Sequence, residues 1–212
     1  MQRARTREQS VATDAGPGRL VVAEAPDPTV VVMLGGGASG QVHTADLDAL
    51  AAALPGRGIT VARYELPWRV AGKKMGPRPP ASDPWWDAGL AAVRTAYPGI
   101  PVITGGRSAG ARIACRTWTP EVPAVVALSF PLHPPGHPEK SRAAELRRVG
   151  GPVLMVSGAR DPFGSAPEWR EECRQAHAGP REFVEIPGAT HSFPSQTTAS
   201  VVEAAALFLQ RW

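Results

Sequence analysis

Cysteine is scarce in this chain of 212 residues, which has only Cys115 and Cys173, and long apolar runs are lacking altogether. A membrane-spanning helix needs about 20 predominantly apolar residues, so we expect no contact with a membrane. A secretory signal also needs an apolar segment, and residues 1–18 contain arginines but no such segment. The two cysteines are far apart and lie in expected helices. We therefore predict free thiols in a reducing compartment, and a cytoplasmic protein.

Motifs for nucleic acids and metals are lacking as well. The 23 basic residues exceed the 19 acidic ones only slightly, giving a net charge of +4, and they are dispersed along the chain. No zinc-finger spacing, RNA-binding aromatic motif or metal-ligand cluster is present in the sequence. We therefore expect no nucleic-acid partner, no metal and no organic cofactor. Residues 1–18 suggest a disordered basic tail, for which contact with nucleic acid or a membrane is an alternative, and residues 19–212 suggest a single domain.

What the sequence does have is a regular alternation of strand-like and helix-like runs. Residues 29–34 form a continuous β-branched run, which is typical of a strand buried on both faces. Strands that alternate with helices predict an α/β fold with a mostly parallel central sheet and helices on both faces. The expected strands cover residues 20–24 (a short edge strand), 29–34, 58–64, 101–104, 124–130, 153–157 and 182–186. The expected helices cover residues 46–54, 85–96, 111–118, 142–148, 166–177 and 199–212.

The most informative segment is residues 106–110, which read G-x-S-x-G between an expected strand and an expected helix. A serine on a sharp strand-to-helix turn forms a nucleophile elbow, which lifts the hydroxyl above the edge of the sheet. The two glycines fit this setting because they let the strand and the helix approach closely. We therefore predict that Ser108 is the nucleophile of a serine hydrolase. The alternative is a structural glycine-rich turn.

A serine hydroxyl needs a histidine to accept its proton and an acid to orient that histidine. In the α/β-hydrolase fold these groups follow the nucleophile in the order acid, then histidine. Asp161 comes shortly after the strand 153–157, and His191 comes shortly after the strand 182–186. A helix-capping or turn aspartate and a surface histidine are the alternatives. The remaining histidines do not follow the last strand; they are His43, His133, His137 and His177.

The oxyanion hole of such a site needs two backbone N–H groups. We expect one from Ala109, directly after the serine, and one from Gly36, in the glycine-rich loop after the strand 29–34. A plain flexible loop is the alternative. Possible substrate contacts are Gly35, Gly37, Trp68, Arg107 and His133, although a structural role in a proline-rich loop suits His133 better.

A proline- and glycine-rich excursion covers residues 67–82. Its cations could attract a carboxylate-bearing substrate, or they could form a solvated face. These cations are Arg69, Lys73, Lys74 and Arg78.

With these residues assembled, the chain resembles the compact α/β-hydrolase family related to testis-expressed protein 30 and to subunit 3 of the NSL histone-acetylation complex. That group is itself similar to dienelactone hydrolases. The resemblance extends from Thr29 to Trp212 and implies the triad Ser108, Asp161 and His191. It rests on the glycine loop 35–38 and on the segments 63–68 (RYELPW), 105–112 (GGRSAGAR), 130–140 (FPLHPPGHPEK), 158–164 (GARDPFG) and 188–193 (GATHSF).

Two positions depart from the pattern of this family. Leu34-Gly35 stands where His-Gly is common, which removes a polar side chain but leaves the backbone donors. Ala109 stands where Met is common, and its smaller side chain predicts a roomier site.

The sequence thus predicts a serine hydrolase that cleaves a small ester, thioester or related acyl bond through an acyl-enzyme. Its expected partner is a small-molecule acyl substrate, and the protein is expected to be a monomer or homodimer. A chain of this length leaves little room for a cap domain, so we expect a small, open pocket unsuited to long-chain lipids. Two alternatives stay open: a non-catalytic interaction scaffold, and an acyl transferase or cyclase of a biosynthetic pathway that uses the same triad.

Overall fold

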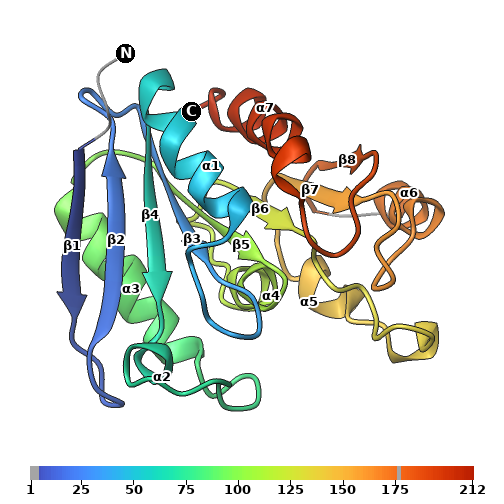
Figure 1. Cartoon of the computed structure of the whole chain (residues 1–212), viewed down its shortest axis with the longest axis horizontal. Coiled ribbons are helices and arrows are strands. Elements are labelled where there is room, and N and C mark those ends of the chain that lie inside the picture. Colours follow the sequence, from blue (N-terminus) through green and yellow to red (C-terminus); the bar gives the residue numbers. More distant parts are fainter. Residues whose placement is uncertain (1–4, 176–177) are drawn as a thin grey trace.

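Eight strands form one sheet in the computed structural model, which describes residues 5–175 and 178–212. Their order across the sheet is β1-β2-β4-β3-β5-β6-β7-β8 (Figure 1). The strands β3 to β8 run parallel, while β2 is antiparallel to β4 and β1 is antiparallel to β2. The strands are β1 (Arg5–Val11), β2 (Gly18–Glu24), β3 (Val30–Gly35), β4 (Ile59–Glu65), β5 (Val102–Arg107), β6 (Val125–Leu128), β7 (Val153–Gly158) and β8 (Arg181–Ile186).

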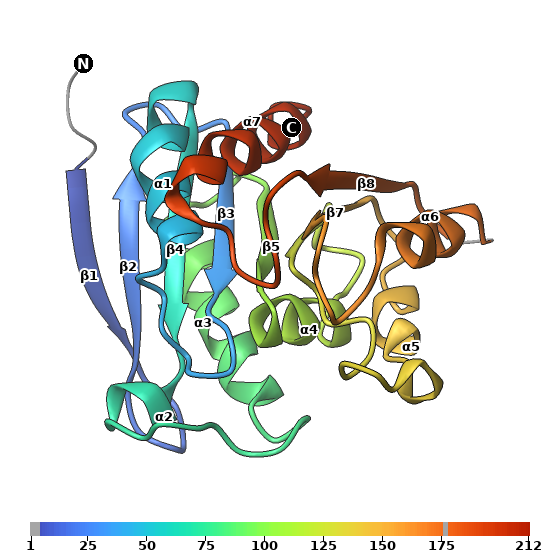
Figure 2. The ribbon, with the colours of Figure 1, turned by 45° about the vertical axis from the view of Figure 1, so that its right-hand side comes forward.

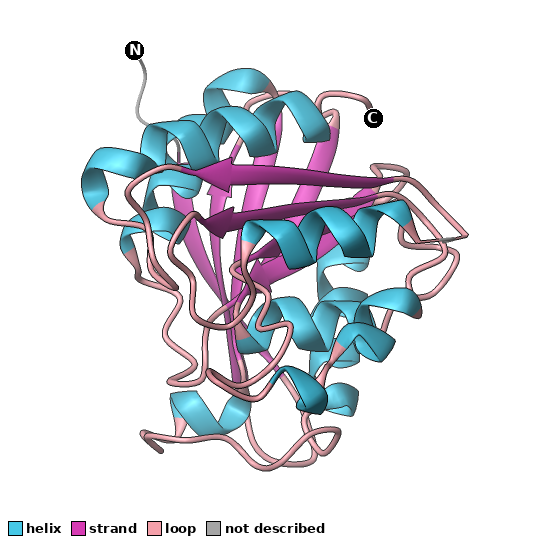
Figure 3. Cartoon of the chain, turned by 90° about the vertical axis from the view of Figure 1, so that its right-hand side faces the viewer, coloured by secondary structure: helices cyan, strands magenta, loops and turns pink. Residues whose placement is uncertain are grey.

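Helices cover both faces of this sheet (Figures 2 and 3). One face carries α1 (Ala45–Ala53) and α7 (Thr198–Leu209), whose apolar side chains share one buried core. The other face carries α3 (Asp83–Ala96), α4 (Ala109–Arg116), α5 (Ala143–Arg147) and α6 (Ala166–Arg174) over a second core. The remaining short elements are α2 (Pro67–Val70) and the 3-10 turns η1 (Leu54–Arg57), η2 (Pro138–Lys140) and η3 (Ser195–Thr197). The predicted mostly parallel sheet with helices on both faces is therefore confirmed.

The strand β3 shows why its sequence is apolar at every position. Val30, Val32 and Leu34 pack into the core under α1 and α7, whereas Val31 and Met33 pack into the core on the other face. Successive side chains of a strand point to opposite faces, so a strand with a core on each side needs an apolar residue at each step. The central strands thereby hold the carboxyl edge of the sheet in place.

The expectation of a disordered tail over residues 1–18 is wrong for the part that the structure describes. Arg5–Val11 forms β1, which pairs along its whole length with β2. Arg7 Nε lies 2.5 Å from Glu24 Oε1, and Trp85 Nε1 donates to Asp14 Oδ1 at 2.6 Å. An edge strand needs no apolar run, because backbone hydrogen bonds and ion pairs can hold a charged sequence there. The first four residues lie outside the described ones.

Other differences concern the ends of elements. β2 is not an edge strand, because β1 lies outside it. The strand expected over residues 124–130 ends at Leu128, since Ser129 turns the chain with a φ of 44°. The helix expected over residues 166–177 ends at Arg174, and His177 lies outside the described residues. The short helix α2 was not predicted.

No cap domain is inserted into the sheet within residues 5–175 and 178–212. None of the helices among them is long and apolar enough to cross a membrane.

The two cysteines differ in their access to solvent. Both are free thiols; Cys115 on α4 is completely buried and Cys173 on α6 is partly exposed. Burial raises the pKa of the Cys115 thiol to about 12. Because the thiolate is the reactive form, Cys115 should be inert in the folded protein.

We predict that a maleimide reagent at pH 8 modifies one thiol per folded molecule, at Cys173, and two thiols in denaturant. Intact-protein mass spectrometry measures this directly. Modification of both thiols at similar rates in the folded protein would contradict the packing of α4.

Candidate active site

Ser108 lies at the turn between β5 and α4, with φ 52° and ψ −107°. A residue with a side chain is strained in this region of backbone space, at a cost of order 1–3 kcal/mol. A hydrogen bond to the neighbouring strand stabilises this strained conformation, since the Ser108 N–H donates to the Leu128 carbonyl at 2.9 Å. The turn therefore fixes the serine as a nucleophile elbow would.

The two glycines of the motif are required by the neighbouring strand. A Cβ at Gly106 would lie 2.6 Å from the Gly35 carbonyl oxygen, and a Cβ at Gly110 would lie 2.4 Å from the same atom. Gly106 also has a φ of 155°. The end of β3 thus packs against the turn so closely that only hydrogen fits at both positions.

The structure brings Ser108, His191 and Asp161 together in one chain of hydrogen bonds. His191 Nε2 lies 2.9 Å from Ser108 Oγ, and His191 Nδ1 lies 2.9 Å from Asp161 Oδ2 and 3.1 Å from Oδ1. Asp161 follows β7 and His191 follows β8, so parallel strands deliver both loops to the edge at which β5 ends. With Nδ1–H donated to the carboxylate, Nε2 is free to accept the serine proton.

The carboxylate of Asp161 is almost completely buried, with 1% of its side chain exposed. Ser157 Oγ donates to Oδ2 at 3.1 Å, and the Phe163 N–H donates to Oδ1 at 2.9 Å. A buried carboxylate is tolerated only when such donors replace water. Nothing in the sequence pattern singled out Ser157, although a small polar residue near the end of an apolar strand is a usable signal.

The imidazole of His191 also has a partner on its face. The Phe163 ring centroid lies 4.2 Å from that of His191, with an angle of 36° between the planes. This contact limits rotation of the imidazole. Phe163 was not among the predicted site residues.

The glycine loop after β3 and the start of α4 lie on either side of Ser108. A Cβ at Gly36 would lie 2.2 Å from the Gln41 carbonyl oxygen, and a Cβ at Gly37 would lie 3.8 Å from Ser108 Cβ. The first hydrogen bond of α4 runs from the Arg112 N–H to the Ser108 carbonyl. The N–H of Ala109 therefore has no acceptor within the helix. This arrangement, at the positive end of the helix dipole, suits a negatively charged oxygen.

Arg107 contacts the protein rather than an open space. Its Nη2 donates to the His191 carbonyl at 2.9 Å and to Ser192 Oγ at 2.7 Å, and its Nε lies 3.4 Å from Asp46 Oδ2. Asp46 is itself buried on α1. This side chain therefore ties the loop of His191 to α1 through Nη2 and Nε, and the expected substrate contact of Arg107 stays a prediction.

His133 is likewise occupied by the protein. It is 7% exposed, its Nδ1 lies 2.8 Å from the Pro134 carbonyl and its Nε2 lies 3.0 Å from Glu168 Oε1. Two hydrogen bonds from Ser165, with His133 beside them, lower the pKa of Glu168. Both ring nitrogens have protein partners, which favours the structural role of His133, and a substrate contact stays a prediction.

The other described histidines lie elsewhere. His43 contacts Asp48 and His137 contacts Glu139, at 3.1 Å and 3.0 Å. No group of three or more potential metal ligands is found among the residues that the structure describes.

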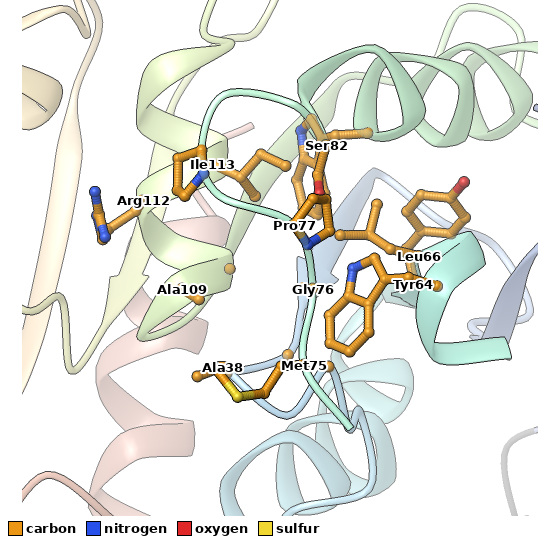
Figure 4. A pocket seen from close by; sticks show the side chains of 18 of the residues that line it. Ala38, Tyr64, Leu66, Met75, Gly76, Pro77, Ser82, Ala109, Arg112 and Ile113 are labelled. Carbon is orange, nitrogen blue, oxygen red and sulfur yellow. The ribbon is translucent and has the colours of Figure 1, made fainter. Parts of the chain in front are cut away.

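A cavity of about 240 Å³ is lined by neighbours of Ser108, namely Gly37, Ala109 and Gly110, but not by Ser108 itself (Figure 4). Its lining includes Gly35, Gly36, Gly37, Trp68 and Ala109, which the sequence had placed in the oxyanion hole or near the substrate.

Comparisons with known proteins agree with this architecture. A family model described as "Alpha/beta hydrolase domain" matches residues 27–208. An alpha-beta serine hydrolase homologue from Coxiella burnetii superposes with a TM-score of 0.77 at 20% identity, over 96% of this chain and 97% of that chain. A serine hydrolase without a lid from Xanthomonas campestris gives 0.75 at 18%, over 98% and 95% of the two chains. A dienelactone hydrolase from Anabaena variabilis gives 0.75 at 16%, over 100% and 99%. At these identities the likeness shows the fold alone.

We predict that Arg107→Met lowers kcat for any substrate of this site by about tenfold or more, because charged hydrogen bonds that hold the His191 loop are lost. Steady-state kinetics on the folded variant measure the effect. Arg160→Met is the matched control: Arg160 Nη2 also donates to this loop, at the Gly188 carbonyl, but from the exposed side. Equal losses in the two variants would contradict the role assigned to Arg107.

Proposed function

The chain belongs to the alpha/beta hydrolase family, and we propose that it is a serine hydrolase that cleaves a small ester, thioester or related acyl bond. One observation carries the proposal: Ser108 Oγ, His191 Nε2 and Nδ1, and Asp161 Oδ2 form a continuous hydrogen-bonded chain with 2.9 Å at each step. This is the arrangement that turns a weakly nucleophilic hydroxyl into a nucleophile.

In the first half of the reaction, Ser108 Oγ attacks the carbonyl carbon while His191 Nε2 accepts the hydroxyl proton. The Asp161 carboxylate stabilises the imidazolium that forms. The carbonyl oxygen becomes negative and is stabilised by the N–H groups of Gly36 and Ala109. When the tetrahedral intermediate collapses, the bond to the leaving group breaks and His191 gives that group its proton.

The second half repeats these steps with water. His191 Nε2 removes a proton from a water molecule while the water oxygen attacks the carbonyl carbon of the acyl-enzyme. The bond from that carbon to Ser108 Oγ then breaks, Oγ takes the proton from His191, and the acid leaves. The reaction consumes one water and yields one acid and one alcohol or thiol. No step needs a metal or an organic cofactor.

The backbone strain at Ser108 supports this role. A scaffold protein has no need of a serine held at φ 52°, and strained residues persist where the strain serves the mechanism. An acyl transferase would use the same atoms and differ only in the acceptor that replaces water. The narrower resemblance to the testis-expressed protein 30 group, a cytoplasmic location and a monomeric or homodimeric state remain predictions.

We predict that Ser108→Ala lowers the hydrolysis of p-nitrophenyl acetate by on the order of 10⁴-fold, and that His191→Ala and Asp161→Asn lower it strongly as well. Release of p-nitrophenol measures the rate, and circular dichroism checks the fold. Ser200→Ala, at an exposed serine on α7, is the matched control and should keep the wild-type rate.

Undiminished hydrolysis in Ser108→Ala would refute the proposal. Hydrolysis that is low in water but accelerated by an added alcohol or amine, with the acyl group recovered on that acceptor, would identify acyl transfer instead.

A further inference from the structure

The cavity beside Ser108 has a definite position relative to the reacting groups. One wall is α4, with Ala109, Arg112 and Ile113, and the opposite wall holds Tyr64 and Leu66 (Figure 4). The glycine loop closes one end and residues 75–79 cover the cavity from outside. Ser108 itself is not among the lining residues, although Ala109 and Gly110 directly after it are, and no residue of the His191 loop or of the Asp161 loop lines the cavity.

This position decides which part of a substrate enters. A carbonyl carbon under attack by Ser108 carries an oxygen, a leaving group and an acyl substituent. The oxygen faces the N–H groups of Gly36 and Ala109, and the leaving group must face His191, which protonates it. Because the cavity adjoins Gly36 and Ala109 but not His191, its occupant is the acyl substituent.

We infer that this cavity is an acyl-binding pocket that selects a short, uncharged, apolar acyl group, either a short alkyl chain or a single aromatic ring. The inference rests on the proposed function, since only an acyl-enzyme chemistry at Ser108 gives the cavity this occupant.

The apolar character follows from the walls. Trp68 and Trp86 are buried and contribute indole rings, and Leu66 and Ile113 add aliphatic surface. Tyr64 belongs to the same wall; its hydroxyl donates to the Trp85 carbonyl at 3.0 Å, and burial raises its pKa to about 12. A charged acyl group would lose its hydration in such surroundings without gaining a partner.

The two arginines of the lining do not supply that partner. Arg112 donates Nε and Nη2 to the two carboxylate oxygens of Glu145, at 2.7 and 2.6 Å. Arg116 donates Nε and Nη2 to the two carboxylate oxygens of Asp83, at 3.2 and 2.6 Å. Figure 4 shows the Arg112 side chain extending away from the other lining residues. Each two-point ion pair already neutralises its arginine, so a substrate carboxylate gains less from Arg112 and Arg116 than from unpaired cations, and the pocket disfavours acid-bearing acyl groups.

The loop over the pocket does not change this conclusion. Its cations Lys73, Lys74 and Arg78 are exposed and Arg69 is half-buried, and none of the four is among the lining residues, whereas Met75 lines the cavity at 78% exposure. The expectation that these cations draw a carboxylate into the site therefore finds no support in the position of the side chains.

The size limit comes from the volume and from one fixed wall. The cavity of about 240 Å³ is smaller than the roughly 300–1,000 Å³ of pockets for drug-sized ligands. Trp68 cannot move toward Gly40 or Gly76, because even a Cβ there would lie 2.5 or 2.7 Å from its ring. A long acyl chain would have to leave through the mouth at Met75.

The test compares p-nitrophenyl esters that share one leaving group. We expect kcat/KM for the valerate and phenylacetate esters to exceed that of the glutarate half-ester, which has the valerate chain length with a terminal carboxylate, by about tenfold or more. The laurate ester should also be poorer. Hydrolysis of all esters at similar kcat/KM, or a preference for the half-ester, would overturn the inference while leaving the serine hydrolase intact.

A matched pair of variants locates the selectivity. Leu66→Trp fills the pocket and should lower kcat/KM for valerate at least about fivefold more than for acetate, whose methyl group needs little of the pocket. Leu207→Trp makes the same change at an exposed leucine of α7 and should alter neither ester. Equal effects of Leu66→Trp on acetate and valerate would contradict an acyl pocket at this place.

A binding measurement separates the pocket from the chemistry. Ser108→Ala cannot form an acyl-enzyme, yet it should bind valeramide and not glutaramate in saturation-transfer NMR, and Leu66→Trp should abolish the valeramide signal. Binding with this preference in a protein that hydrolyses no ester would sustain the pocket and refute the proposed reaction. Equal binding of the two amides would refute the pocket.

Discussion

Gly106 and Gly110 approach the carbonyl of Gly35 so closely that a methyl group at either position would overlap it. This contact between the end of β3 and the β5–α4 turn sets the position of everything around Ser108. At this turn the serine has a positive φ, and Ala109 lines the same cavity as the glycine loop. The two glycines of G-x-S-x-G are therefore required by the close approach of two backbone segments, and only the serine is required by the chemistry.

The parallel sheet supplies the rest of the geometry. Because β5, β7 and β8 end at one edge, loops that are distant in sequence meet there, and Asp161 and His191 reach Ser108. Side chains then fix these loops. Ser157 and the Phe163 N–H hold the buried carboxylate, Phe163 packs on the imidazole and Arg107 ties the histidine loop to α1. The proposed triad would depend on such supporting contacts, since small displacements of a catalytic group are costly.

The central strands and the order of the three proposed catalytic residues could be predicted from the sequence, because the pattern of apolar residues reflects burial. Apolar runs such as residues 30–34 are continuous because both faces of β3 are buried, so strands and their order relative to Ser108, Asp161 and His191 could be predicted. The strand β1 could not, because its stability comes from pairing and ion pairs with distant residues. The contacts of Arg107 could not be predicted for the same reason. A guanidinium can bind a substrate anion or a backbone carbonyl, and only the structure shows that this one contacts the His191 carbonyl and Asp46. The pairing of Arg112 and Arg116, which neutralises the charge of these two lining residues, is equally a matter of tertiary contacts.

In the proposed function, one strained serine, activated by its neighbours, is the nucleophile of this chain. The most direct measurement is peptide mapping by mass spectrometry after reaction with a fluorophosphonate, which phosphonylates only an activated serine. We expect a single adduct on the peptide that contains Ser108, and loss of that adduct in His191→Ala, because Ser108 then lacks its base. Absence of an adduct in the folded wild-type protein, or an adduct on another residue, would contradict it.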